Sequence, residues 1–111
     1  MNERKTVDAL SALAHEHRLS IFRLLVEAGP EGKAAGDIAE ALDMAPSSLS
    51  FHLTLLNRAG LIYQRRESRS LIYSADFECM NALVGFLTEN CCGGRSCAPA
   101  ARRVSERKKR A

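Results

Sequence analysis

The chain has 111 residues, of which 46% are hydrophobic, 26% are charged and only 5% are aromatic. These proportions are typical of one small globular domain, and chains of this size often gain core by association of two copies. No apolar run approaches the roughly 18 residues of a membrane-spanning helix. The N-terminus also lacks the apolar centre and small-residue cleavage site of a secretory signal, so we expect a cytoplasmic protein.

The net charge of +3 is distributed unevenly. Residues 102–111 (RRVSERKKRA) contain six basic residues and one acid, which gives +5, so the other 101 residues sum to −2. The folded part is therefore not basic. Residues 98–111 are predicted to be a solvated, disordered tail that adds weak, salt-sensitive attraction to nucleic acid.

In chain order, apolar spacing and turn residues predict four helices in the first half. They cover Thr6–Ala14, His17–Ala28, Ala34–Asp43 and Pro46–Ala59. Two short runs rich in β-formers follow, residues 61–66 and 70–74, and predict a hairpin. A last helix is predicted over Asp76–Asn90. The order α-α-α-α-β-β-α predicts a mainly α fold with a β-hairpin wing, in which residues 1–90 form one domain.

The fourth predicted helix has two distinct faces. Leu49, Leu53 and Leu56 recur at i, i+4 and i+7 and should face the core. Ala34–Asp43, a short turn and this helix together form a helix-turn-helix pattern, which predicts a DNA-binding unit. The candidate DNA contacts are polar or basic side chains of the second helix and of the hairpin: Ser47, Ser48, Ser50, His52, Thr54, Arg65, Arg66 and Arg69.

Each of these features also has a purely structural interpretation. Early serines often cap a helix or lie on its polar surface. His52 can simply be hydrogen-bonded on a half-buried face. The hairpin arginines can protect an exposed edge strand against pairing. Their combination with a helix-turn-helix favours DNA binding.

The chain resembles the ArsR family of winged-helix metal-sensing repressors over about residues 7–92. The most specific parts of the resemblance are the segment SLSFHLTLLNRAGL and the double cysteine after LTEN. The resemblance implies a homodimer built from the first and last helices, whose recognition helices enter successive major grooves of a two-fold symmetric operator. An apolar stripe on the last helix independently favours such a partner, although it is equally a common core pattern: Met80, Leu83, Val84 and Leu87.

Two inducer sites known in that family are missing from this sequence. The positions that match the C-x-C-x-x-C motif of many arsenic sensors hold Ala34, Gly36 and Ala39. The positions that match the last-helix zinc site of other members hold residues without either histidine: Asp76, Glu78, Glu89 and Cys92.

What remains is a cluster that holds three of the four cysteines, Cys91, Cys92 and Cys97, in the segment 91–97. It resembles a family variant that binds arsenite through C-terminal cysteines. Trivalent arsenic prefers three thiolates, and soft thiolates select soft ions. Gly93 and Gly94 allow the chain to turn back so that the sulfurs converge. We therefore expect As(III) as inducer of a repressor that is not an enzyme.

Cys79 is not expected to complete a zinc site. It precedes Cys91 by 12 residues on the same predicted helix, roughly 18 Å along the axis. A small buried hydrophobe is the expected role of Cys79.

Three alternatives for the cluster stay open. A disulfide from Cys97 to Cys91 or Cys92 would make a redox sensor. The cysteines can also have no role. Finally, Cys97 and Arg103 have the C-x5-R spacing of phosphatases and arsenate reductases, without the strand and helix that normally flank that loop.

Overall fold

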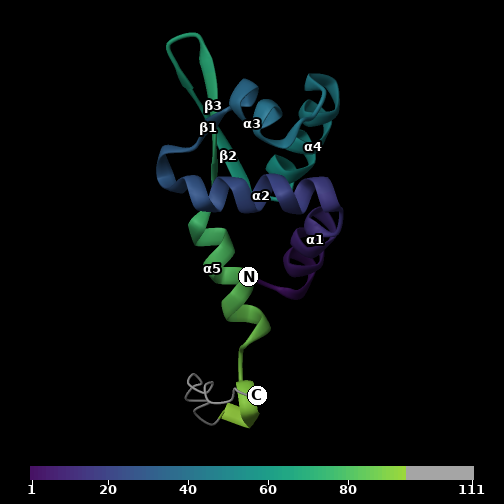
Figure 1. Cartoon of the computed structure of the whole chain (residues 1–111). Coiled ribbons are helices and arrows are strands. Elements are labelled where there is room, and N and C mark those ends of the chain that lie inside the picture. The colour runs from purple at the N-terminus through teal and green to yellow at the C-terminus, as the bar shows by residue number, and fades with distance from the viewer. Residues whose placement is uncertain (95–111) are drawn as a thin grey trace, which may run out of the picture.

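The computed structural model describes residues 1–94 and confirms the predicted fold class (Figure 1). The helices are α1 (Glu3–Leu13), α2 (Glu16–Ala28), α3 (Ala35–Leu42), α4 (Pro46–Arg58) and α5 (Phe77–Leu87). The strands are β1 (Lys33–Ala34), β2 (Ile62–Glu67) and β3 (Ser70–Ala75). Two 3-10 turns cover Gly29–Glu31 and Cys91–Gly94.

The sheet has a third strand that the sequence did not predict. The hairpin of β2 and β3 is antiparallel, with Ile62 opposite Ala75. On the other edge of β3, β1 pairs Lys33 with Tyr73 and Ala34 with Ile72, which gives the order β1-β3-β2. Strand β1 has only two residues and no alternating pattern, so it forms because β3 offers an edge to pair with. Ala34 is therefore a strand residue rather than the start of a helix.

Two helix ends differ from their predicted positions. Helix α1 begins at Glu3 rather than Thr6 because Oδ1 of Asn2 accepts a hydrogen bond from the Lys5 amide at 2.9 Å. Helix α5 ends at Leu87 rather than Asn90. The Thr88 amide and hydroxyl both donate to the Val84 carbonyl, at 3.1 and 2.8 Å, and the left-handed φ of 58° at Asn90 takes the chain out of the helical path.

The core lies between α2, α4 and the base of the wing. As predicted, Leu49, Leu53 and Leu56 of α4 are buried, together with Ile21, Leu25, Ile38, Leu61 and Ile62. Helix α2 crosses the middle of the molecule, the hairpin projects to one side of it, and α5 leads away on the other (Figure 1). The wing and the Cys91–Gly94 turn therefore lie at opposite ends.

Candidate functional site

Helix α4 presents an exposed polar face, as predicted. Ser47, Ser48, Ser50 and Thr54 are all exposed on it, and Phe51 stands out among them with 60% of its surface accessible. The helix starts at Pro46 without a side-chain cap, which leaves first-turn amides open to solvent or to an anion. Hydroxyls, open amides and one apolar ring are suited to phosphates, base edges and thymine methyl groups.

His52 lies on the opposite flank of α4. Its side chain is only 7% exposed, and its Nδ1 lies 3.2 Å from Nη1 of Arg18 on α2. Burial, followed by electrostatic interactions with His15, Arg18 and His17, lowers the pKa of His52. The ring is directed into the domain, which is the structural role considered for it above, rather than toward the polar face.

The three wing arginines differ in their surroundings. The Arg65 guanidinium donates to the Glu31 carbonyl at 2.7 Å, to the Ser74 hydroxyl at 3.0 Å and to the Glu67 carboxylate at 2.9 Å. These contacts attach the wing to the loop before β1. Arg66 and Arg69 are exposed, and neither side chain makes a hydrogen bond or ion pair within residues 1–94, so in this part of the chain they are the wing cations available to phosphates.

A hollow of about 290 Å³ separates α4 from the wing. Its polar lining comes from both elements: Ser50, Thr54, Asn57, Arg58, Gln64 and Tyr73. The sequence did not single out Gln64. Its only signal in the sequence was its place in the predicted strand, directly before Arg65 and Arg66. That signal was too weak to interpret.

The cysteine turn lies just beyond α5. The sulfur atoms of Cys91 and Cys92 are 3.7 Å apart, and both residues are exposed. Asn90, Cys92 and Gly93 have left-handed φ angles of 58°, 57° and 68°. Adjacent side chains diverge on a regular helix, so this left-handed path is what brings the two sulfurs together. Cys97 and the predicted tail lie outside the described residues.

Cys79 is separate from this turn. It is half-buried in the first turn of α5 and packs against the core, close to the role expected for it. Burial, and then the carboxylate of Asp76, raises the pKa of the Cys79 thiol.

The apolar stripe of α5 divides between the core and the surface. Leu83 is buried and Met80 packs against the core, whereas Val84 and Leu87 are 54% and 58% exposed. Helix α1 contacts α5 and exposes further apolar side chains, Val7 at 55% and Leu10 at 42%. Exposed apolar groups on two adjoining helices are typical of a protein interface.

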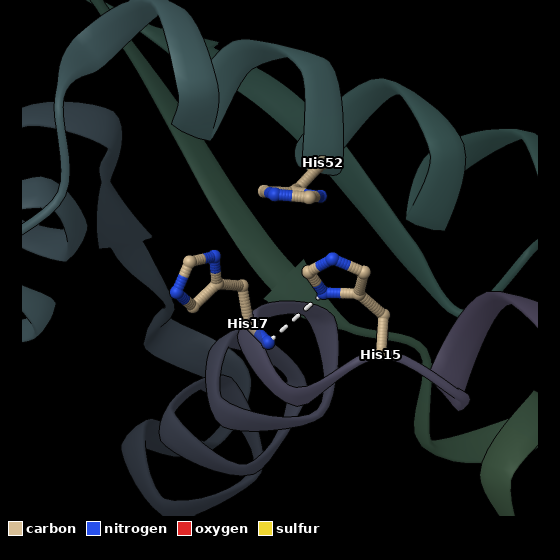
Figure 2. Close-up of side chains that lie close together, drawn as sticks. All are labelled: His15, His17 and His52. Atoms are coloured by element: carbon tan, nitrogen blue, oxygen red, sulfur yellow. Dashed lines mark hydrogen bonds between the residues drawn. The ribbon is translucent and has the colours of Figure 1, made fainter.

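Three histidines that lie far apart in the sequence meet between α2 and α4 (Figure 2). The ring of His15 lies 5.4 Å from that of His17 and 4.7 Å from that of His52, between centroids. His15 also caps α2, because its Nδ1 accepts a hydrogen bond from the His17 amide at 3.1 Å. No spacing in the sequence groups these residues, since their proximity depends on the packing of α2 against α4.

This fold and this surface define a winged-helix DNA-binding transcriptional regulator. A family model described as a helix-turn-helix domain matches residues 13–65. The transcriptional activator HlyU of Vibrio cholerae is 31% identical over 86 residues, which cover 78% of this chain and 77% of HlyU. The chain belongs to the ArsR family of winged-helix regulators, as the sequence predicted, and is not an enzyme.

Solved structures agree with this assignment. A structure of V. cholerae HlyU covers 83% of this chain and 99% of its own, with 30% identity and a TM-score of 0.65. Another, described as reduced HlyU, covers 82% and 93% with 31% identity and the same TM-score. Mb0332 from Mycobacterium bovis is described as a homodimeric winged helix-turn-helix domain. It is 26% identical, covers 86% of this chain and 94% of its own, and has a TM-score of 0.62.

A further relative matches a shorter part of the chain. The putative arsenical resistance operon repressor ArsR of Halobacterium salinarum is 38% identical over 63 residues. That match covers 57% of this chain and 48% of the relative. Within residues 1–94, no helix is both long enough and apolar enough to cross a membrane.

Proposed function

We propose that this regulator is an arsenite-responsive repressor. It binds its operator as a homodimer and leaves it when As(III) is held by Cys91, Cys92 and Cys97. The observation that carries the proposal is the 3.7 Å approach of the Cys91 and Cys92 sulfurs in the turn after α5. Two adjacent thiols that already converge need little rearrangement to bind one thiophilic atom.

The backbone path supports this use of the turn. Asn90 and Cys92 both adopt left-handed φ angles, which cost a non-glycine residue roughly 1–2 kcal/mol each. Gly93 and Gly94 continue with positive φ at no such cost. The chain therefore turns instead of extending α5, and only two residues separate Gly94 from the third cysteine.

In the proposed DNA complex, the polar face of α4 enters a major groove and the wing lies over neighbouring phosphates. Ser47, Ser48, Ser50 and Thr54 carry the groove contacts, and Arg66 and Arg69 carry the phosphate contacts. His52 and Arg65 are assigned positioning roles, because their side chains are committed to Arg18 and to the loop before β1.

The proposed signal runs through the dimer. Val7 and Leu10 of α1 and Val84 and Leu87 of α5 form the apolar surface on which a second copy would pack. Arsenite at the end of α5 would change how the two α5 helices meet, and hence the spacing of the two α4 helices. Such coupling is reciprocal, so DNA must weaken arsenite binding by the same factor, typically about 5–150-fold.

The repressor role and the inducer draw support from the name of the H. salinarum relative, an arsenical resistance operon repressor. HlyU is named an activator, so the direction of regulation needs its own measurement. A regulator of this kind works where the operator DNA is, which for this proposal is the cytoplasm.

A thiol-redox switch is the second candidate. Two observations favour it: Cys91 and Cys92 are both exposed, and a structural relative is described specifically as reduced. In this alternative, oxidation of Cys91 or Cys92 with Cys97 forms a disulfide, and an oxidant such as peroxide accepts the two electrons.

The deciding experiment uses a duplex selected for tight binding to the full-length protein, with anisotropy as the readout. Arsenite added in the presence of reductant should release the wild-type protein and the matched control Cys79→Ser. It should not release Cys91→Ser/Cys92→Ser or Cys97→Ser. Release of the double variant by arsenite contradicts the proposal, and release by peroxide but not by arsenite favours the redox switch. In vitro transcription from the same duplex should fall when protein is added.

A further inference from the structure

Apart from the positioning role of His52, the three-histidine cluster between α2 and α4 takes no part in the proposed function. His15, His17 and His52 each offer a ring nitrogen, and these nitrogens all lie within 4.8 Å of one another. Figure 2 shows the imidazole of His52 below α4, facing the rings of His15 and His17 at the start of α2. From this convergence we propose a binding site for a divalent first-row transition metal ion of the zinc class, with three histidine ligands.

The donor set suits this class of ion. Neutral imidazole binds zinc, copper and nickel well, whereas magnesium and calcium prefer oxygen ligands. Zinc–nitrogen bonds of about 2.0–2.1 Å in a tetrahedron place ligand nitrogens roughly 3.3 Å apart. The cluster therefore has to contract modestly. His15 and His17 are exposed and can rotate, while His52 is buried and fixes one corner of the site.

The existing hydrogen bonds identify the ligand atoms. Arginine has no acceptor, so Nδ1 of His52 accepts from Arg18 at 3.2 Å. Nδ1 of His15 likewise accepts from the His17 amide at 3.1 Å. The nitrogen left for a metal on these two rings is Nε2, and a fourth position remains for water, as in zinc sites with three protein ligands.

Metal binding through Nε2 changes both hydrogen bonds. Each of these neutral rings now carries its proton on Nε2, and that proton must move to Nδ1 through solvent before Nε2 can bind. Nδ1 then becomes a donor and faces two other donors, the His17 amide and the Arg18 guanidinium. Arg18 must therefore turn away from His52 when the site fills. Its contact would be replaced by a metal link between α4 and the start of α2.

This site is independent of the cysteine turn. His52 lies on the helix that carries the proposed DNA contacts, two positions after Ser50, whereas Cys91 follows α5 at the other end of the molecule. The link would fix the orientation of α4 relative to α2. Zinc binding at the three histidines does not require that arsenite binds at the cysteine turn.

The test uses the full-length chain with Cys91, Cys92 and Cys97 changed to serine, so that thiolates cannot bind zinc. Calorimetric titration with Zn²⁺ should give one ion per chain. His15→Asn keeps a side chain that can cap α2 and His17→Gln is at an exposed position, so neither change should unfold the protein. Each should weaken zinc binding by at least about tenfold, because even the loss of a residue that only supports a metal ligand lowers metal affinity by about 10–100-fold.

Glu16→Gln is the matched control, because Glu16 is exposed and lies between the two histidines. Its zinc affinity should lie within about twofold of that of the parent protein. The circular dichroism spectrum should be the same for every variant. Saturation of the site should also raise the melting temperature of the parent protein and not that of His17→Gln. No zinc binding below about 1 mM, or affinity unchanged in either histidine variant, would overturn the proposal.

Discussion

The guanidinium of Arg18 joins two parts of the chain that are 34 residues apart: its Nη1 contacts Nδ1 of His52 at 3.2 Å. Its Nε also donates to the Ala12 carbonyl, at the end of α1, at 2.7 Å. One side chain thus connects α1, α2 and the helix proposed to contact DNA.

Removing that head group should destabilise the fold. Arg18→Met keeps the apolar stem and leaves the Ala12 carbonyl and His52 without their donor, so the free energy of unfolding should fall by about 1–3 kcal/mol. Urea denaturation measures this loss. A double-mutant cycle that combines Arg18→Met with His52→Leu should give an interaction energy of about 0.5–3 kcal/mol between the two side chains. Arg23→Met, at an exposed position of the same helix, is the control and should change stability by less than about 0.5 kcal/mol.

Arg65 and Arg66 are adjacent on β2, yet their replacement should have different effects. Arg65→Met breaks the contacts with Glu31 and Ser74 and should cost about 1–3 kcal/mol of unfolding free energy. Arg66→Met should leave stability unchanged but weaken DNA binding and reduce the salt slope of log K by about 1. Denaturation and anisotropy over a range of salt concentrations test the pair. The same loss of stability in both variants would contradict the separate roles.

The exposed apolar surface of α1 and α5 is the proposed dimer interface. Val84→Lys would place a charge in that surface and should raise the dimer dissociation constant by at least about tenfold, because leaving a charge unpaired at an apolar contact costs well over 1.4 kcal/mol. Sedimentation equilibrium measures the change. Leu19→Lys, at a 44% exposed position of α2, is the matched control. A dimer that tolerates both substitutions equally would place the interface elsewhere.

Gly32 is predicted to be indispensable for attaching the wing. Its φ is +71°, and a Cβ there would overlap the Tyr73 carbonyl oxygen and the Ser74 hydroxyl. With ψ at −165° this is backbone that essentially only glycine adopts, so Gly32→Ala should cost about 2–6 kcal/mol from the backbone and the steric overlap together.

The control for this substitution is Gly29→Ala. Gly29 has a similar backbone, with φ +79° and ψ −167°, and nothing near its Cβ position, so only the backbone cost of about 1–3 kcal/mol should be lost. Thermal or urea denaturation of the two variants isolates the cost of the overlap. Equal losses of stability in the two variants would show that Tyr73 and Ser74 move enough to accommodate a Cβ at position 32.

The recognition unit was predictable because its signals are local. Leu49, Leu53 and Leu56 define the buried face of α4 by spacing alone, and Pro46 marks its first turn. Strand β1 was not predictable in this way, because it depends on an edge of β3 some forty positions away.

The sequence by itself determined the order of helices and strands, the polar face of α4 and the grouping of the C-terminal cysteines, because each follows from residue type and short-range spacing. Only the tertiary structure decided which polar side chains lie against one another. Arg65 is held by the loop before β1, His52 by Arg18, and His15 and His17 complete a cluster with His52. These contacts join residues about 35 positions apart, and no local propensity encodes which of them will meet when α2 packs against α4 and the wing folds back.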